Sequence, residues 1–206
     1  MIMRASDSDS FSPKTLAVGF DEAGRGPLAG PVCAAAVILP DDFPVDILND
    51  SKKLSEKKRI FAEDIIKQRS CWAVALVEHD EIDRINILRA TMLAMRRAFL
   101  DLQKMLPAWL ERTGYGPAVL QGIVDGNRCP EIGIECRCEP KADGKYPQVM
   151  AASILAKTCR DRIMLEMDEK YPAYGYARHK GYPTAEHREI CRRLGPSPIQ
   201  RLTFRY

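Results

Sequence analysis

The sequence predicts an α/β fold in which a mixed β-sheet is covered by helices on both faces. Two observations support this prediction. Apolar runs of strand length occur first in direct succession and then alternate with helical segments, an order typical of a sheet flanked by helices. The chain of 206 residues is also long enough to bury a sizeable core, and its length favours one domain with an appendage over two equal domains.

Five segments are expected to form strands. The first, Leu16 to Phe20, is an apolar run that leads into two acidic residues, and the second, Val32 to Leu39, is rich in alanine and ends at Pro40. Because these two segments are close in sequence, we expect them to pair in the antiparallel direction across a loop. The other three expected strands are Trp72 to Val77, Val119 to Val124 and Ile134 to Cys138.

Helices are predicted from caps and from the spacing of apolar residues. Ser55 can cap a helix whose buried stripe is expected to contain Ile60, Phe61, Ile65 and Ile66. From Leu88 to Leu106, apolar residues recur at spacings of three and four, which indicates a long amphipathic helix. An alanine-rich helix is expected from Gln148 to Lys170, and a terminal helix from Thr184 to about Leu194.

The composition is that of an ordinary globular protein, with 46% hydrophobic and 29% charged residues. No apolar stretch is long enough to span a bilayer. Residues 1–14 lack the apolar core of a secretion signal, so we expect a disordered tail there and a cytoplasmic protein. The net charge of +3 identifies no partner, but basic residues gather at Lys52 to Arg59 and after Lys157, as an enzyme acting on a polyanion would need.

Seven cysteines with irregular spacing are an odd number, which favours free thiols in a reducing cytosol. Cys129, Cys136 and Cys138 form a cluster in sequence, and a zinc site is the alternative interpretation. The Cys136-x-Cys138 spacing lacks the two-residue gap of a zinc knuckle, however, and no fourth ligand is apparent nearby. A structural role is therefore favoured.

The segment Asp21 to Gly26 contains two neighbouring acids followed by a glycine-flanked arginine. Neighbouring side chains of a strand point to opposite faces. Glu22 can therefore converge with Asp21 only if the backbone turns, which Gly24 and Gly26 make easy. Two carboxylates beside an open backbone suggest a hard cation held against a ligand that approaches main-chain atoms. A polar turn with one acid capping a backbone N–H is the alternative.

Two further acids lie at the ends of expected elements. Asp125 repeats the arrangement of Asp21, because it ends an apolar strand and has glycine directly behind it, and Asp143 lies in a turn before the alanine-rich helix. Adjacent strand ends bring such residues together at one edge of an open sheet. Asp21 would share its strand face with the small residues Ala17 and Gly19. Four carboxylates so placed could hold two magnesium ions.

Five motifs and a later histidine, His187, cover nearly the whole chain apart from the N-terminal tail. The motifs are Gly19 to Val32, Asp50 to Leu54, Val124 to Asn127, Ala151 to Lys157 and His179 to Thr184. In this order they closely resemble the motifs of bacterial ribonuclease HII, the type 2 ribonuclease H. The first motif alone is quite specific, and the coincidence of all five by chance is not credible.

The resemblance implies a ribonuclease H-like mixed five-stranded sheet flanked by helices. The catalytic core would span residues 15–165, and residues 166–206 would form a helical C-terminal extension packed on it. The implied activity is that of a two-metal phosphodiester hydrolase that needs Mg²⁺ or Mn²⁺. It would hydrolyse the RNA strand of RNA–DNA hybrids and cut 5′ of ribonucleotides embedded in duplex DNA, leaving 3′-hydroxyl and 5′-phosphate ends. The protein would be a monomer that does not associate with a membrane.

Matching by motif, the resemblance implies catalytic and metal-binding roles for four acids: Asp21, Glu22, Asp125 and Asp143. Asp143 departs from the family pattern, which usually has Lys-Gly-Asp where this chain has Lys141-Ala142-Asp143. Alanine is tolerated there unless the backbone needs a positive φ. Asp161 is the competing candidate, but it lies mid-helix four residues after Lys157, where a structural ion pair is the better explanation.

The resemblance also implies how RNA is distinguished from DNA. Gly24, Arg25 and Gly26 would read the 2′-hydroxyl, and Tyr182 would stack beneath the following deoxyribose. Three nearby tyrosines are weaker alternatives that are better explained by packing: Tyr171, Tyr174 and Tyr176. Contacts to phosphate, or support of the acids, are assigned to four residues: Lys52, Lys53, Ser153 and Lys157.

Two other functions stay open. One is a DNA-junction nuclease that shares the sheet, and the other is a nucleic-acid-binding protein that has lost catalysis, although the four carboxylates speak against the latter. The segment Gln200 to Phe204 loosely resembles peptides that dock on a bacterial sliding clamp. In the resembling family a similar segment packs on the core, and packing is the preferred interpretation here.

Overall fold

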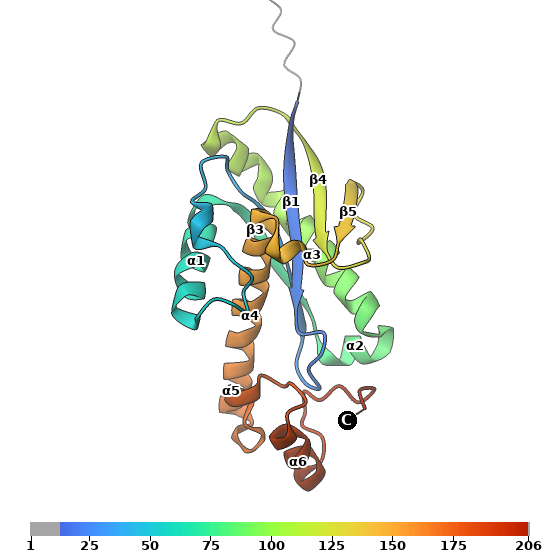
Figure 1. The fold of residues 1–206 in the computed structure, drawn as a ribbon. Coiled ribbons are helices and arrows are strands. Elements are labelled where there is room, and N and C mark those ends of the chain that lie inside the picture. Colours follow the sequence, from blue (N-terminus) through green and yellow to red (C-terminus); the bar gives the residue numbers. More distant parts are fainter. Residues whose placement is uncertain (1–12, 206) are drawn as a thin grey trace, which may run out of the picture.

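The computed structural model describes residues 13–205, so most of the tail expected at residues 1–14 lies outside the described part of the chain. Its centre is a five-stranded sheet with the strand order β3-β2-β1-β4-β5 (Figure 1). The strands are β1 (Lys14–Ala23), β2 (Val32–Ile38), β3 (Cys71–Val77), β4 (Ala118–Asp125) and β5 (Glu135–Glu139). All five strands expected from the sequence are present.

The sheet is mixed, as predicted. β1 pairs with β2 in the antiparallel direction, and β2 pairs with β3 in the same way. β4 runs parallel to both β1 and β5. The pairing of β1 with β4 begins at Lys14 and Ala118, so β1 starts two residues before the apolar run at Leu16. Backbone hydrogen bonds to the neighbouring strand extend β1 beyond its apolar residues.

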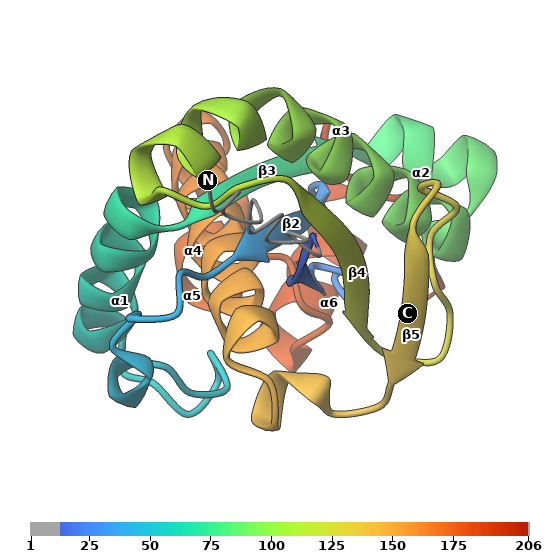
Figure 2. The same ribbon diagram turned by 90° about the horizontal axis from the view of Figure 1, so that it is seen from above.

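Helices cover both faces of the sheet (Figure 2). The helices are α1 (Glu56–Arg69), α2 (His79–Ile85), α3 (Ile87–Thr113), α4 (Pro147–Lys170), α5 (Tyr176–His179) and α6 (Ala185–Leu194), with short 3-10 helices η1 (Val45–Ile47), η2 (Ala142–Gly144) and η3 (Pro172–Tyr174). Helix α3 packs against β2 and β3 on one face, whereas α4 packs against β1 and β2 on the other and contacts α1. This is the layered α/β arrangement that the sequence predicts.

Alternate residues of β2 divide the core into two parts. Ala34 and Ala36 belong to the cluster under α3, which includes Phe20 and Phe99 with ring centroids 6.0 Å apart. Ala35 belongs to the second cluster, under α1 and α4. The side chains of a strand alternate between faces, and the small alanines of this central strand let helices approach from both sides.

Two helix predictions need correction. Ile60 and Phe61 are 48% and 59% exposed, so their assignment to the buried stripe of α1 is wrong. Ile66 is buried as expected and Ala62 joins it, because α1 meets α4 and β3 along that side. Helix α2 was not expected from the sequence. It is separated from α3 by Asn86, which has a φ of 68° and whose side chain accepts hydrogen bonds from the first turn of α3.

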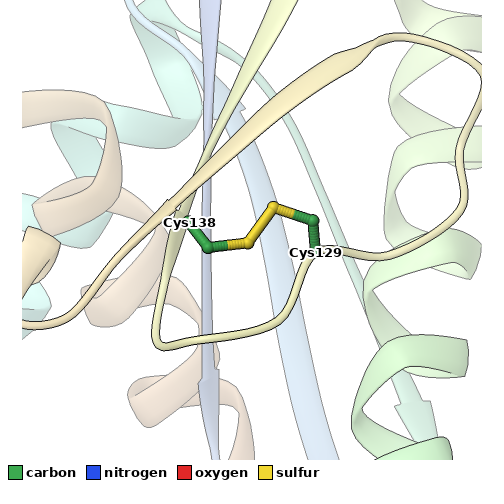
Figure 3. The surroundings of a disulfide bond; sticks show 2 residues. All are labelled: Cys129 and Cys138. Carbon is green, nitrogen blue, oxygen red and sulfur yellow. A yellow bond between two sulfur atoms is a disulfide. The ribbon is translucent and has the colours of Figure 1, made fainter.

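Cys129 and Cys138 form a disulfide bond between the β4–β5 connection and β5 (Figure 3). The expectation that every thiol is free is therefore wrong for these two residues, whereas the five other cysteines form no disulfide bond. β5 runs parallel to β4, so the connecting chain has to travel back along the sheet before β5 begins. This return brings the two Cα atoms to 5.8 Å.

The chain after α4 folds beneath the sheet and returns to the β1–β2 loop (Figure 1). Gln200 forms an isolated antiparallel bridge with Ala29, and Arg201 N–H donates to the carbonyl of Leu28 at 2.8 Å. Across the described residues, no helix is long and apolar enough to cross a membrane.

Candidate functional site

Asp21 and Asp125 lie side by side because their strands are parallel neighbours. In the β1–β4 ladder Phe20 is opposite Val124, and each of these residues is directly followed by the aspartate. Asp21 is only 5% exposed. Parallel pairing thus brings the two carboxylates to the same edge of the sheet, as their positions at the ends of apolar strands predicted.

Asp143 joins them through the short helix η2, which follows β5. The carboxylate of Asp125 accepts a hydrogen bond from the backbone N–H of Ala142 at 2.8 Å. The left-handed conformation in this turn belongs to Lys141, with a φ of 62°, and not to Ala142, so alanine is accommodated without strain at the position where the family pattern has glycine. One carboxylate oxygen from each of Asp21, Asp125 and Asp143 lies within 4.8 Å of the others.

Glu22 borders this group but does not belong to it. Its side chain lines the same cavity as Asp21, and Arg25 donates a hydrogen bond to its carboxylate at 3.3 Å. Burial raises the pKa of Glu22, Arg25 opposes this effect, and the negative charge of Asp125 adds to it. Glu22 is therefore close enough to sense the cluster electrostatically, while its carboxylate is held by Arg25.

The electrostatics of the cluster favour a bound cation. Burial raises the pKa of Asp21 well above its usual value, and the charge of Glu22 raises it further. Burial followed by the charge of Asp125 also raises the pKa of Asp143. Crowded carboxylates are disfavoured in their ionised form, and oxygen-only ligands suit hard divalent cations such as Mg²⁺ or Mn²⁺. The three aspartates therefore fit a divalent metal ion.

A close contact between α4 and β1 supports Asp21. A Cβ atom on Gly19 would lie 2.2 Å from the backbone carbonyl carbon of Gln148, so only glycine lets α4 pack directly on the strand at this point. The strand face that Asp21 shares with Ala17 and Gly19 is thus covered by a helix. This packing brings the hydroxyl of Ser153 into hydrogen-bonding reach of Asp21, where it lowers the pKa of that carboxyl.

Ser51 is a site residue that sequence reasoning did not assign. Its hydroxyl lies 2.9 Å from the hydroxyl of Ser153, and both side chains are buried. The signal was present, because Ser51 lies within the Asp50 to Leu54 motif. Its partner is more than a hundred positions away, however, so nothing local in the sequence indicates the contact.

A cavity of about 480 Å³ opens beside the carboxylates. Its lining contains two of the four expected metal-binding acids, Asp21 and Glu22, together with Ser51 and Ala23. It also contains every residue that was expected to contact substrate or support the acids except Lys53: Gly24, Arg25, Gly26, Lys52, Ser153, Lys157 and Tyr182. Asp125, Asp143 and Lys53 are not part of this lining, although Lys52 and Lys53 both lower the pKa of Asp143. The expected residues thus form one continuous region.

Asp161 lies outside the carboxylate cluster. Its carboxylate accepts a hydrogen bond from Lys157 Nζ at 2.6 Å, which is the structural ion pair expected from the four-residue spacing. Lys157 is therefore held along α4 by Asp161, and it also lines the cavity.

Tyr182 is the tyrosine that faces the cavity. It is 40% exposed, and a Cβ atom on Gly26 would lie 3.7 Å from its ring. By contrast, Tyr176 is fully buried and stacks on Tyr174 with ring centroids 5.9 Å apart. The packing explanation for Tyr174 and Tyr176 agrees with these contacts.

The family model of ribonuclease HII matches residues 18–206. The chain belongs to the ribonuclease HII family. A ribonuclease HII from Dechloromonas aromatica (strain RCB) is 52% identical over 193 residues, which cover 93% of this chain and 92% of that protein. Family membership confirms the predicted resemblance and gives the chain the activity class of the family, an endoribonuclease of the ribonuclease H type.

Solved structures of ribonuclease HII and its relatives share the fold. A chain of the PCNA:RNase HII complex from Archaeoglobus fulgidus has a TM-score of 0.66 and 26% identity, covering 93% of this chain and 96% of that chain. Ribonuclease H2 from Pyrococcus horikoshii OT3 has the same TM-score and identity, covering 92% and 93%. Bst-RNase HIII in complex with Mn²⁺ has a TM-score of 0.68 at 21% identity, covering 93% and 68%. The predicted ribonuclease H-like fold is confirmed.

Proposed function

We propose that this protein hydrolyses the RNA strand of RNA–DNA hybrids and cuts on the 5′ side of ribonucleotides embedded in duplex DNA, leaving 3′-hydroxyl and 5′-phosphate ends. One observation carries the proposal. The carboxylate oxygens of Asp21, Asp125 and Asp143 lie within 4.8 Å of one another, at the rim of a cavity whose wall contains the Gly24-Arg25-Gly26 loop. A group that suits phosphodiester hydrolysis thus adjoins a backbone that suits recognition of a sugar.

Asp21, Asp125 and Asp143 would hold the divalent metal, with Glu22 as the fourth ligand once its contact with Arg25 is released. Bound Mg²⁺ or Mn²⁺, in a pair during catalysis, would activate water and neutralise the charge that develops on the phosphate. The choice between the two ions rests on the donor set, since carboxylates suit both. Bst-RNase HIII was solved with Mn²⁺, and its likeness to this chain shows the fold alone.

Sugar recognition is assigned to the Gly24-Arg25-Gly26 loop and to Tyr182. The 2′-hydroxyl is the group that distinguishes RNA from DNA at a given site. Gly26 has no side chain to keep a ribose away from the backbone, and the exposed ring of Tyr182 lies directly beside it. A ribonucleotide in the cavity would meet the loop with its 2′-hydroxyl, and the following deoxyribose would lie on the ring.

Phosphate contacts are assigned to Lys52, Lys53 and Lys157. Lys52 and Lys157 line the cavity, and Lys53 is close enough to lower the pKa of Asp143. Ser153 supports Asp21 through its hydroxyl. The three lysines would offset the charge of the phosphate backbone next to the acids.

We propose that the protein acts as a monomer and that its partner is the nucleic acid. Archaeoglobus fulgidus RNase HII was solved in a complex with PCNA. A weak contact of the present protein with a sliding clamp, through Gln200 to Phe204, is therefore an alternative to packing of this segment on the core. Gln200 and Arg201 are buried, at 3% and 0% exposure, which supports packing on the core for this part of the segment. Leu202, at 72% exposure, and Thr203, which is also exposed, are the residues of this segment that a clamp could reach.

Cleavage mapping tests the proposal. The substrates are a DNA duplex with one ribonucleotide and the same duplex made entirely of DNA, each incubated with Mg²⁺, with Mn²⁺ and with a chelator. We expect a metal-dependent cut 5′ of the ribonucleotide and no cut in the all-DNA duplex. Equal cutting of both duplexes would instead favour a junction nuclease, and binding without cutting would favour a non-catalytic protein.

Two matched variants locate the catalytic acids. Asp125→Asn should abolish cleavage while the fold survives. Asp161→Asn is the control, because this acid is paired with Lys157 and lies outside the carboxylate cluster; it should retain metal-dependent cleavage, with at most a higher KM since Lys157 loses its partner. Full activity of Asp125→Asn with magnesium would rule out the carboxylate cluster as the catalytic site.

A further inference from the structure

Arg201 lies fully buried beneath the β1–β2 loop, with 0% of its surface exposed. Its guanidinium donates four hydrogen bonds to backbone carbonyls of this loop. Nη2 donates to Gly24 at 2.7 Å, Nη1 donates to Arg25 at 3.2 Å and to Pro27 at 2.8 Å, and Nε donates to Gly30 at 2.9 Å. A residue of the C-terminal segment therefore holds the Gly24-Arg25-Gly26 loop in place through hydrogen bonds.

These contacts fix the direction in which the loop presents its backbone donors. In a trans peptide the carbonyl and the following N–H lie in one plane and point in opposite directions. Because the carbonyls of Gly24 and Arg25 point at Arg201, the N–H groups of Arg25 and Gly26 point away from it. Among residues 13–205, neither of these N–H groups has a hydrogen-bond acceptor. Two backbone donors are thus held outward and unused beside the cavity.

A glycine-rich loop would not hold this geometry by itself. Gly24 has a φ of 102° and Gly30 a φ of 80°, and glycine samples many backbone conformations in the absence of other contacts. The planar guanidinium is a rigid fork with fixed donor directions. Four bonds from one rigid group leave the loop little freedom.

Arg160 of α4 extends the same support to Tyr182. Its guanidinium donates to the carbonyls of Ala29 and Pro31, both at 3.0 Å, and to Lys180 at 2.9 Å, and it lies 5.8 Å from the ring centroid of Tyr182. The loop and the turn before Tyr182 are therefore joined through one buried side chain.

The buried charge of Arg201 points to a role beyond packing. Among the described residues Arg201 forms no salt bridge, and burial, followed by the charge of Arg160, lowers its pKa to about 9, with the charge of Asp83 opposing this effect only in part. Burying an unpaired charge is unfavourable compared with an apolar side chain of similar size. Its compensation comes from the loop carbonyls, so the guanidinium and the loop conformation depend on each other.

We propose that Arg201 is a positioning residue for ribonucleotide selectivity: it holds the N–H groups of Arg25 and Gly26 toward the cavity, where they bind the 2′-hydroxyl and the adjoining phosphate of the substrate. This inference rests on the proposed function. The C-terminal segment then contributes to the site that recognises the sugar, although most of the sequence separates this segment from the loop.

Arg201→Lys tests the proposal, because lysine keeps the charge but lacks the rigid fork. The readouts are kcat and KM on the duplex with one ribonucleotide and the inhibition constant of the matching all-DNA duplex. We expect the ratio of the inhibition constant to KM to fall roughly tenfold or more, as the loss of hydrogen bonds from a charged group implies. A merely structural role would lower the amount of active enzyme and leave this ratio unchanged.

Met95→Ala is the control for lost stability. Met95 is a fully buried core residue of α3 that does not line the cavity, and its truncation should lower the melting temperature and preserve the ratio. If wild type cleaves the ribonucleotide duplex and folded Arg201→Lys keeps the wild-type ratio, the positioning role is wrong. If wild type itself does not cleave, the proposed function is wrong instead.

Asp83→Asn decides the question if Arg201→Lys does not fold. The carboxylate of Asp83 accepts hydrogen bonds from the backbone N–H groups of Leu202 at 2.7 Å and Thr203 at 3.1 Å, so it anchors the segment that carries Arg201. Asp83 lies outside the cavity lining. The variant should lower the ratio in the same direction by a smaller factor, and an unchanged ratio would overturn the proposal.

Discussion

The carboxylate of Asp125 and the backbone N–H of Ala142 are joined by a hydrogen bond of 2.8 Å, which ties the end of β4 to the turn that carries Asp143. The bond places the third acid of the cluster, because the residue after Ala142 can then reach the edge of the sheet. It also explains why the departure from the glycine of the family pattern leaves the site intact. The backbone N–H makes the contact, and the methyl group of Ala142 is buried beside Ile123 and Val149.

Ala142→Gly should therefore destabilise the protein by about 1 kcal/mol, since it frees the backbone of the unfolded chain and removes a buried methyl group. Lys141→Gly is the matched comparison, because Lys141 occupies the left-handed region with a φ of 62°, where glycine fits without strain. It should leave stability unchanged or raise it by up to about 1 kcal/mol. Chemical denaturation of both variants checks the assignment, and greater stability of Ala142→Gly would contradict it.

Asp21→Asn should stabilise the metal-free protein at neutral pH while abolishing cleavage. Burial raises the pKa of Asp21 in the folded state, so folding favours its protonated form. The stability gained from this preference is present below the unfolded-state pKa and is lost as pH rises through the folded-state pKa. Wild type with a chelator should therefore lose more stability than Asp21→Asn as pH rises from the unfolded-state pKa through the folded-state pKa of Asp21. Parallel pH dependence of the two unfolding free energies would contradict the prediction.

Divalent metal should reverse this penalty. Mn²⁺ or Mg²⁺ that binds the folded carboxylates raises the melting temperature of wild type by mass action. Asp21→Asn lacks one of the charged ligands and should show a smaller rise at the same metal concentration. Chelator-treated samples of both proteins without added Mg²⁺ or Mn²⁺ provide the baseline, and equal stabilisation of both proteins would place the bound metal elsewhere.

Gly19→Ala should damage both the fold and the site. The new methyl group would meet the backbone of Gln148 at 2.2 Å, so α4 has to move away from β1 and carry Ser153 with it. Overpacking of this kind costs roughly 1–3 kcal/mol or more, and we expect a lower melting temperature together with a lower kcat. Gly144→Ala is the control, because nothing lies within 4 Å of a Cβ atom there. A wild-type melting temperature for Gly19→Ala would show that the contact is not tight.

The ease of prediction from sequence depends on how local the determining contacts are. Asp21 and Asp125 are predictable, because each ends an apolar strand and parallel pairing aligns the two ends. The exposure of Ile60 and Phe61 could not be predicted, because contact with α4, which is distant in sequence, determines which face α1 buries. The hydrogen bond from Arg201 to the carbonyl of Gly24 could not be predicted for the same reason. Such contacts are determined by packing between segments that are distant in sequence, and neither residue type nor local spacing indicates them.

Tyr182 offers the final test of the sugar-binding wall. Its ring is 40% exposed and lies beside Gly26, so truncation should change substrate binding more than folding. Tyr182→Phe keeps the ring and should retain KM within about twofold, whereas Tyr182→Ala should raise KM roughly tenfold, as the loss of an aromatic contact surface implies. Both variants should melt within a few degrees of wild type, because an exposed side chain contributes little to the core. Equal KM values for the alanine and phenylalanine variants would mean that the ring does not contact the deoxyribose.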